Sequence, residues 1–285
     1  MKRSTRIVLA RETLRIATAG AYTAPSGRVV QLSPAIKDCL KGTRFLTPEE
    51  LEQLRKKVLA SPFPSLRTSF EVANETTLEG IRRLSAGGEP VAALSFASAK
   101  NPGGGVFNGS QAQEESLARS SALYPSLLRG EQYYQRHRAD PSLLYTDAMI
   151  YSPACPIFRS DEGRLLEEPQ FAGFITSAAP NAGAAADIRP HELPLIPETF
   201  LRRSEYVLAL AASEGYRHLV LGAWGCGVFR NDPSVVAAAF AAHLLAGSWR
   251  DRFEQVVFSV LDKSVEQATF NTFQRVFAPT GSPSA

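Results

Sequence analysis

Two patterns of hydrophobic and polar positions divide the chain near residue 67. From Thr68 onward, short apolar runs alternate with longer segments that carry apolar residues at helical spacing. This alternation predicts an α/β fold, with a largely parallel or mixed sheet covered by helices. The expected strands are Ser69–Val72, Val91–Ser95, Ala148–Tyr151, Phe171–Thr176, His218–Gly222 and Val256–Leu261. The expected helices are Thr77–Leu84, Gln111–Leu128, Glu198–Ser213, Pro233–Leu245 and Ser264–Phe277.

The residues before this point follow a mainly helical pattern. Apolar positions at helical spacing predict a helix over residues 7–17, and residues 22–32 are typical of a short hairpin. Thr47, Pro48 and Glu50 form a capping box with proline at the first helical position, which predicts a second helix. The expected organisation is a small N-terminal helical accessory region over residues 1–66, a main domain over residues 67–278 and a flexible tail over residues 279–285.

The composition is that of an ordinary globular protein. Hydrophobic residues make up 44% of the 285 residues and charged residues 21%, which excludes disordered, collagenous and coiled-coil proteins. The longest apolar stretch, Val235–Gly247, is 13 residues long and contains His243. A membrane-spanning helix needs about 20 apolar residues, so no membrane association is expected.

Cysteine and histidine spacing argues against disulfides and metal sites. The three cysteines, Cys39, Cys155 and Cys226, are far apart and odd in number, which favours a reducing compartment and hence a cytoplasmic protein. The four histidines show no HExxH motif or other paired spacing. The sequence therefore predicts no metal ion and no cofactor.

The charge balance mildly favours an anionic ligand. The net charge is +3 and the isoelectric point is about 8.8, so the surface potential attracts anions. Lysine and arginine are spread along the chain without an aromatic-interleaved basic block. Direct nucleic-acid binding is therefore not expected.

A glycine-rich loop follows the strand expected at Val91–Ser95. It contains Asn101 and three consecutive glycines, Gly103–Gly105, which permit positive φ angles and direct approach of a ligand to the main chain. Ser110 with Gln113 matches a capping box, so a helix should begin here with two glutamates in its first turn. Adjacent helical residues diverge by about 100°, so the two carboxylates can serve different groups of one ligand.

Each piece of this loop also has a purely structural interpretation. Glycine-rich turns are common, and the helix dipole favours acidic residues in any first helical turn. The combination of a strand, a triple-glycine loop and a helix that opens with Gln-Glu-Glu is more specific than either piece.

A second glycine-rich loop, Gly222–Pro233, follows the strand expected at His218–Gly222. Its alternating glycines leave main-chain N–H groups able to cradle an anion such as a diphosphate, and Asp232 should cap the next helix. Cys226 has no adjacent activating group, so a nucleophilic role is not expected. A third segment of small residues, Ser177–Gly183, should lie at the same sheet edge or form an ordinary turn.

These motifs resemble a known enzyme family. Gly103–Gly105, seven intervening residues and then Gln113–Glu115 look like the signature of poly(ADP-ribose) glycohydrolases, whose catalytic domain is a macrodomain. The Gly222–Phe229 loop resembles the diphosphate-binding loop of that fold. The short chain with a small N-terminal extension is similar to the bacterial-type members. The resemblance implies a macrodomain-like mixed sheet sandwiched between helices, and a catalytic domain over residues 67–278.

The resemblance also implies roles for individual residues. Glu115 would be the catalytic acid and base, Glu114 and Asn101 would bind the terminal riboses, the two glycine loops would surround the diphosphate, and Phe229 would position the distal ribose. The implied catalytic residues are thus Glu115 and Glu114, and the implied substrate-binding residues are Asn101, Gly103, Gly104, Gly105, Gln113, Gly225, Cys226, Gly227, Val228 and Phe229. The implied partners are poly(ADP-ribose) or ADP-ribosylated proteins, attacked from the chain terminus.

The implied chemistry is consistent with a single catalytic carboxyl group. Cleaving a ribose–ribose O-glycosidic bond requires a proton for the leaving oxygen and stabilisation of an oxocarbenium-like transition state. The substrate's own diphosphate can supply the second requirement, so no carboxylate nucleophile is needed.

Two other functions stay open on the sequence alone. One is a non-catalytic ADP-ribose reader on the same fold, although two adjacent carboxylates offer an anionic ligand no attraction. The other is a hydrolase of single protein-linked ADP-ribose or of another nucleoside-diphosphate sugar. A Rossmann dehydrogenase fits the sequence poorly, because no GxGxxG follows a strand with an acidic residue about 20 positions later.

Overall fold

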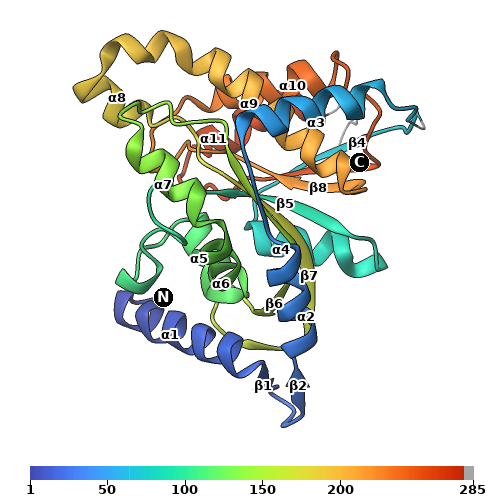
Figure 1. Ribbon diagram of the computed structural model, residues 1–285, viewed down its shortest axis with the longest axis vertical. Helices are drawn as coiled ribbons and strands as arrows, with labels where there is room; N and C mark the ends of the chain where they lie inside the picture. The colour runs from blue at the N-terminus through green and yellow to red at the C-terminus, as the bar shows by residue number, and fades with distance from the viewer. Residues whose placement is uncertain (64, 279–285) are drawn as a thin grey trace.

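Helices enclose both faces of a central mixed sheet in the computed structural model, which describes residues 1–63 and 65–278 (Figure 1). The sheet has seven strands in the order β3-β6-β7-β5-β8-β9-β4. The expected tail over residues 279–285 lies outside the described residues. The strands of this sheet are β3 (Arg44–Leu46), β4 (Ser69–Ala73), β5 (Val91–Phe96), β6 (Met149–Arg159), β7 (Leu165–Ser177), β8 (His218–Leu221) and β9 (Gln255–Ser259).

The strand directions confirm the predicted mixed sheet. Strands β7, β5, β8, β9 and β4 run parallel to one another, whereas β6 is antiparallel to both β7 and β3. The carboxyl ends of β7, β5 and β8 are therefore adjacent at one edge. Every strand predicted from the sequence is present, but β3 was not predicted because three residues carry too little periodicity.

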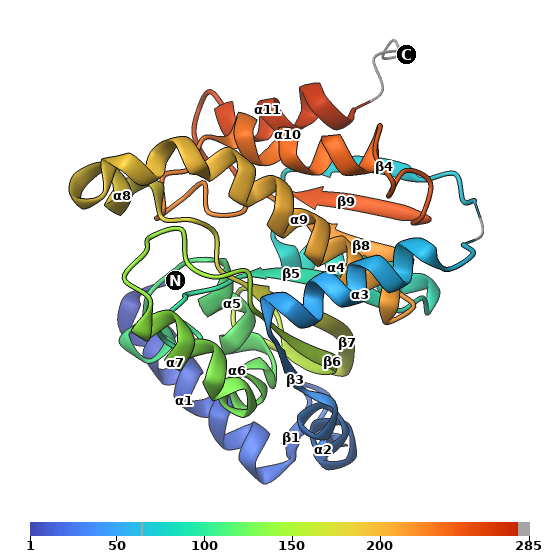
Figure 2. The same cartoon turned by 45° about the horizontal axis from the view of Figure 1, so that its top comes forward.

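Alternating strand residues build two separate cores. Ala92 and Leu94 of β5 belong to one apolar cluster, and Val91 and Ala93 belong to the other. This period of two is the signature of a strand buried on both faces. The first cluster lies under helices α3, α9, α10 and α11, and the second lies under α2, α4, α5, α6 and α7 (Figure 2). Those helices are α2 (Ser33–Gly42), α3 (Pro48–Ala60), α4 (Thr77–Leu84), α5 (Gln113–Ser120), α6 (Leu123–Leu127), α7 (Glu131–Ala139), α9 (Ile196–Ser213), α10 (Pro233–Leu244) and α11 (Ala268–Phe277).

The prediction of a single helix over residues 111–128 is wrong. The segment forms two helices, α5 and α6, separated at Ser121, whose backbone is extended and bridges to Ile157 of β6. The next amide, that of Ala122, donates to the Pro156 carbonyl at 3.0 Å. The pairing with β6 therefore breaks the helix, a tertiary contact that helical periodicity does not reveal.

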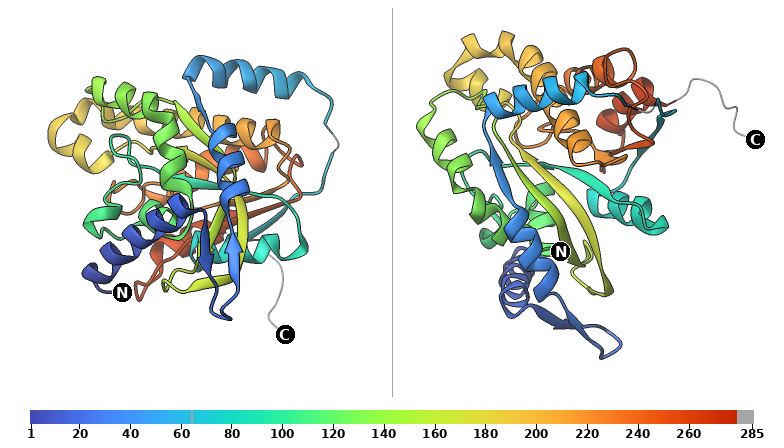
Figure 3. Two further views of the ribbon diagram at one scale, coloured as in Figure 1. Left: turned by 60° about the horizontal axis from the view of Figure 1, so that its bottom comes forward. Right: turned by 45° about the vertical axis from the view of Figure 1, so that its right-hand side comes forward.

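The N-terminal residues form α1 (Arg3–Ala19) and a hairpin of β1 (Ala21–Thr23) and β2 (Val29–Gln31), as expected. The hairpin protrudes beside the β6–β7 turn, where the Ser26 amide donates to Glu167 at 2.9 Å (Figure 3). The capping box of Thr47 and Glu50 is confirmed at the start of α3.

The boundary expected after residue 66 falls between α3 and β4 and stays a prediction. The residues before it supply β3 to the sheet and α3 to one of the helical layers. Among the described residues, no helix is both long enough and apolar enough to cross a membrane. Two further helical elements follow β7, namely α8 (Ala182–Ile188) and the 3₁₀ helix η4 (Pro190–Leu195).

Candidate active site

Three loops meet at the carboxyl ends of the adjacent strands β7, β5 and β8. Ser177, at the end of β7, joins the other two loops through its carbonyl. This oxygen accepts from the Ala97 amide at 3.1 Å and from the Trp224 indole at 3.1 Å. The predicted glycine loops and the small-residue segment after β7 are thus brought together, at the edge where parallel sheets bind ligands.

The start of α5 differs from the predicted capping box. The N-cap residue is Ala112, and Ser110 still belongs to the loop, where its amide donates to the Gly105 carbonyl at 3.1 Å. The Glu115 side chain supplies the other half of a capping box, because its Oε2 accepts from the Ala112 amide at 3.1 Å. The helix therefore begins with its own glutamate folded back on its first turn.

Glu115 is held by two main-chain donors from different segments. Besides the Ala112 amide, the Gly105 amide donates to Glu115 Oε1 at 2.9 Å. The side chain is 8% exposed. Each oxygen thus has a fixed partner, which sets the orientation of the carboxyl group relative to the glycine loop.

Glu114 is more deeply buried than Glu115 and accepts fewer hydrogen bonds. Its Oε2 accepts from the Ser98 amide at 2.7 Å, whereas its buried Oε1 has no hydrogen-bond partner among the described residues. Burial raises the pKa of Glu114 well above its usual value, and the neighbouring Glu115 raises it further. Two adjacent carboxyl groups in unequal surroundings are the arrangement from which distinct acid–base roles arise.

Gln113 links the start of α5 to the neighbouring strand and to α4. Its oxygen accepts from the Phe96 amide at 2.8 Å, and its nitrogen donates to the Leu94 carbonyl at 2.8 Å and to Thr77 Oγ1 at 3.0 Å. Both N–H donors are therefore used inside the protein. The side chain thus fastens α5 to β5, and the predicted contact of Gln113 with substrate stays a prediction.

The space beside the triple glycine is filled by the protein itself. Gly103 and Gly104 have positive φ angles of 65° and 57°. A Cβ atom at Gly104 would lie 2.5 Å from Glu115 Oε1 and 3.1 Å from Glu114 Oε2. The sequence suggested that a ligand requires this space, but in the structure the two carboxyl groups occupy it. Asn101, whose carbonyl closes the turn by accepting from the Gly104 amide at 3.0 Å, is exposed.

The second glycine loop has a different character. Nothing lies within 4 Å of the position that a Cβ atom at Gly227 would take. Within residues 1–63 and 65–278, no backbone or side-chain acceptor bonds the amides of Gly225, Gly227, Val228 and Phe229. A run of free N–H groups of this kind is suited to an anion.

Asn231 anchors this loop, a role that was not predicted from the sequence. Its Nδ2 donates to the Pro180 carbonyl at 2.8 Å and to the Gly225 carbonyl at 3.0 Å. Gly225 has φ 74°, and a Cβ atom there would lie 2.5 Å from Ala179 Cβ. The loop is therefore packed against the segment after β7 at one end and open at the other.

The open end carries the remaining predicted ligand contacts. Val228 is 79% exposed, and Phe229 is half-buried with its ring centroid 6.2 Å from that of Tyr145. Burial raises the pKa of the Cys226 thiol to about 12, in line with the expectation that it is not a nucleophile. Tyr145, a residue that the sequence did not single out, has φ 59°, which is uncommon for a bulky side chain.

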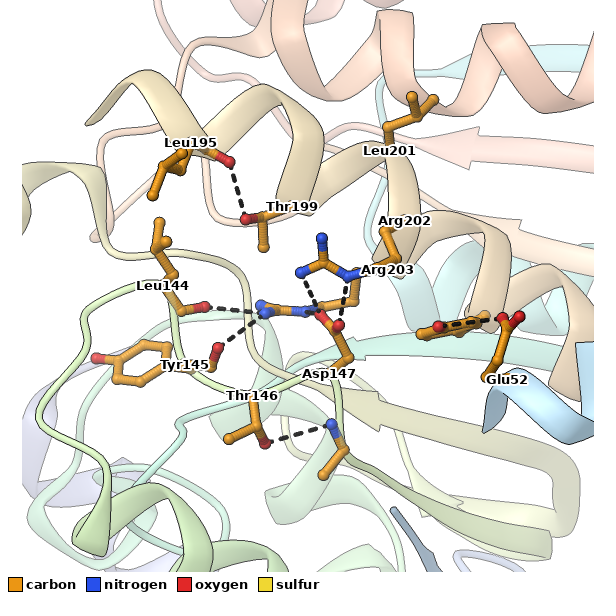
Figure 4. A network of polar contacts seen from close by, with 12 residues as sticks. Glu52, Leu144, Tyr145, Thr146, Asp147, Leu195, Thr199, Leu201, Arg202 and Arg203 are labelled. Carbon is orange, nitrogen blue, oxygen red and sulfur yellow. Dashed lines mark hydrogen bonds and ion pairs between the residues drawn. The ribbon is translucent and has the colours of Figure 1, made fainter. Parts of the chain in front are cut away.

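A buried guanidinium group fixes the backbone around Tyr145 (Figure 4). Arg203 of α9 is fully buried. It donates to Asp147 Oδ1 at 2.9 Å, and to the carbonyls of Ala178 at 2.7 Å, Leu144 at 2.9 Å and Tyr145 at 3.2 Å. One side chain thus joins the segment before β6 to the segment after β7.

Asp147 completes this cluster by pairing with two arginines. Arg202 Nε donates to its Oδ2 at 2.6 Å, beside the bond from Arg203. Burial would raise the pKa of Asp147, but the two guanidinium groups hold it below its usual value. Removing one partner of a buried pair leaves an unpaired charge and costs about 3–5 kcal/mol, so the cluster stabilises the loops it joins. The sequence signal for this cluster was the pair of adjacent arginines, Arg202 and Arg203, within α9.

No three histidine, cysteine, aspartate or glutamate side chains are grouped to hold a metal ion in the part of the chain that the structure describes. The glutamate pair, the open glycine loop and the anchored segments between them form one candidate site. Its chemistry suits an anionic ligand with a bond that is cleaved by acid–base catalysis.

Comparison with known proteins places this site in a family. The sequence profile described as microbial-type PARG, catalytic domain, matches residues 10–160, where PARG denotes poly(ADP-ribose) glycohydrolase. No curated protein sequence matches the chain.

Solved structures are similar over nearly the whole chain. The glycohydrolase from Thermomonospora curvata bound to the inhibitor ADP-HPD is 46% identical, with a TM-score of 0.89, over 95% of this chain and 99% of that chain. The glycohydrolase from Deinococcus radiodurans in complex with ADP-ribose is 48% identical, with a TM-score of 0.83, over 88% of this chain and 100% of that chain.

Proposed function

This chain belongs to the family of microbial-type poly(ADP-ribose) glycohydrolases, and we propose that it releases ADP-ribose from poly(ADP-ribose) with Glu115 as its acid and base. The fold is the macrodomain-like mixed sheet between helices that these relatives share, and the enzyme is a glycosidase. The observation that supports the site assignment is the pair of adjacent carboxyl groups, Glu114 and Glu115, that face the Cβ position of Gly104.

The open glycine loop is the proposed diphosphate site. The free amides of Gly225, Gly227, Val228 and Phe229 can each donate to a phosphate oxygen. The Phe229 ring, supported by Tyr145, would pack on the distal ribose. With the diphosphate and the ribose held in this way, the scissile bond would face the glutamate pair.

The reaction needs one proton transfer to the leaving oxygen and one proton transfer from the attacking water. Glu115 would donate a proton to the oxygen that leaves with the rest of the polymer, and the ribose–ribose bond would break with an oxocarbenium-like transition state. The nearby diphosphate would stabilise the developing positive charge. Glu115 would then accept a proton from the attacking water, which gives free ADP-ribose and restores the acid.

Glu114 has a different proposed role beside this acid. Its buried Oε1 has no hydrogen-bond partner among residues 1–63 and 65–278, and the role proposed for it is to accept from a ribose hydroxyl of the substrate. Its raised pKa also makes it the alternative candidate for the proton donor. Asn101, exposed at the same loop, would bind a terminal ribose.

Attack from the chain terminus follows the resemblance to bacterial-type members. A cytoplasmic location fits the three free cysteines, Cys39, Cys155 and Cys226. Poly(ADP-ribose) and ADP-ribosylated proteins are the proposed partners.

The test is incubation of the pure protein with poly(ADP-ribose), with and without EDTA, followed by chromatography of the products. We expect ADP-ribose as the main product from the earliest times, at the same rate in EDTA, because the acid and the substrate's diphosphate supply the catalysis. Unchanged polymer that still binds would indicate a non-catalytic ADP-ribose reader. Release of ADP-ribose only from singly modified protein would indicate a hydrolase of that linkage. Loss of activity in EDTA and its recovery with magnesium would contradict metal independence.

A further inference from the structure

Arginine side chains from three helices hold the main chain of the first glycine loop. Each guanidinium group donates to a carbonyl oxygen between residues 100 and 110. The bonds are Arg3 to Asn108 at 2.9 Å, Arg6 to Gly109 at 2.7 Å, Arg119 to Ser110 at 2.8 Å and Arg138 to Lys100 at 2.7 Å. Two of the four arginines belong to α1, in the N-terminal region to which the mechanism gives no role.

Helix α1 also packs directly on this loop. Gly109 has φ 72°, and a Cβ atom there would lie 2.7 Å from the Arg3 carbonyl oxygen and 3.0 Å from the Ile7 side chain. Ala10 of α1 is buried in a small apolar cluster with Val106 of the loop. The amino-terminal end of α1 lies against the loop that precedes α5 (Figure 1).

A short chain of hydrogen bonds links α1 to the catalytic carboxyl group. Arg6 donates to the Gly109 carbonyl, and the amide of the same peptide unit, that of Ser110, donates to the Gly105 carbonyl at 3.1 Å. The Gly105 amide in turn donates to Glu115 Oε1 at 2.9 Å. The position of Gly105 therefore depends on a peptide unit that α1 fixes from outside.

We propose that Arg3 and Arg6 are positioning residues for catalysis, which hold the loop in the conformation that orients Glu115. This inference rests on the proposed function, since it assigns α1 a role in the same reaction. A loosened loop would misplace the acid by a fraction of an ångström to an ångström, and such displacements lower rates by up to about 10²-fold. The proposed diphosphate loop follows a different strand, β8, so the affinity for ADP-ribose should change little.

The competing explanation is that a basic helix attracts the polyanionic substrate. The same helix offers a matched control, because Arg11 and Arg15 are exposed on α1, whereas its hydrogen bonds to the loop come from Arg3 and Arg6. Replacing either pair by glutamine removes two positive charges. Only the first replacement removes the hydrogen bonds to Asn108 and Gly109.

The test compares Arg3→Gln/Arg6→Gln with Arg11→Gln/Arg15→Gln in the full chain. We expect the first variant to lose about tenfold in kcat on poly(ADP-ribose), with KM and the Kd for ADP-ribose changed less than about twofold. Hydrogen–deuterium exchange of peptides covering residues 103–111 should become faster. The second variant should retain the wild-type kcat and exchange rates.

Three results would overturn the inference. These are an unchanged kcat in the first variant, an equal loss in both variants, and a loss in the first that appears only in KM. If the double variant folds poorly, Arg6→Gln compared with Arg11→Gln gives a matched test, because each removes one positive charge and the first leaves Arg3 bonded. An inactive wild-type protein would contradict the proposed function itself, whereas an active wild type with an equally active first variant would contradict only the role of α1.

Discussion

The two glycine-rich loops look alike in the sequence but have different surroundings in the structure. In the first loop, the Cβ position of Gly104 is filled by the carboxyl oxygens of Glu115 and Glu114. In the second loop, the Cβ position of Gly227 borders no protein atom within 4 Å. The first loop is thus shaped around the protein's own acids, and the second is left open for a ligand.

The hydrogen bonds of the two loops differ in the same way. The Gly104 and Gly105 amides of the first loop donate to a carbonyl and a carboxylate of the protein. The Gly227 and Val228 amides of the second loop have no acceptor within the described part of the chain. Glycine content alone therefore does not show whether a loop binds a ligand or positions a catalytic group. The hydrogen-bond partners of the loop amides distinguish the two loops and support the proposed roles.

The largest effect should come from the acid itself. Glu115→Gln removes the transferable proton and also points an NH₂ group at one of the two amides that Glu115 now accepts from. We expect kcat to fall by ~10²- to 10⁴-fold, with the Kd for ADP-ribose measured by calorimetry largely unchanged.

Glu114→Gln is the matched control for this prediction. No described residue bonds its Oε1, so an amide fits there without a clash of donors, and we expect weaker binding with residual turnover. If Glu114→Gln is instead the inactive, tightly binding variant while Glu115→Gln turns over, the acid is Glu114, the residue with the raised pKa.

The second effect compares a glycine from each loop. Gly104→Val places a side chain on the two carboxyl groups at a positive φ angle, so kcat should fall by about 10²-fold and Tm should also drop. Gly227→Val meets no protein atom, so it should keep Tm and weaken ADP-ribose binding by about tenfold, which is about 1.4 kcal/mol.

Calorimetric titration and thermal unfolding of both variants measure this contrast. Equal losses of affinity in the two variants would show that both loops contact the ligand in the same way. Unchanged affinity in Gly227→Val would remove the second loop from the diphosphate site.

A smaller effect is expected at the aromatic end of the second loop. Phe229→Ala should lower kcat by roughly tenfold and change ADP-ribose affinity less, because a loosely held ribose loses transition-state geometry before ground-state binding. Steady-state kinetics on poly(ADP-ribose) measure it, with Val228→Ala as a control in the same loop. A fully active Phe229→Ala variant would leave Phe229 as a packing partner of Tyr145 only.

The smallest effect concerns how the stability of the fold depends on pH. The pKa of Glu114 is raised in the folded protein, so the folded state binds more protons than the unfolded state between the two pKa values. Glu114 therefore destabilises the fold as the pH rises above the ordinary glutamate pKa of about 4.3. Glu114→Gln resembles the protonated form and should raise Tm by about 2 °C or more at pH 8, with little change at pH 4.

Thermal unfolding of both proteins over this pH range measures the difference. A Tm difference that is independent of pH would contradict the assignment of a raised pKa to Glu114.

Most of the sheet was predictable, because strands buried on both faces leave continuous apolar runs such as Val91–Leu94. The break between α5 and α6 was not, because it depends on the contact of Ser121 with β6. The cap of α5 was misassigned to Ser110 for a similar reason, since the glycine loop holds Ser110 away from the helix end.

The order of residue types along the chain was sufficient to identify the family and its candidate acid, because Gly103–Gly105 and Gln113–Glu115 are local and specific. What each group does was decided by contacts between distant segments. Gln113 fastens α5 to β5 through hydrogen bonds, and Arg203 joins loops that are more than 30 residues apart in the sequence. Hydrogen bonding and burial act between atoms that are close in space, and only the folded chain brings those atoms together.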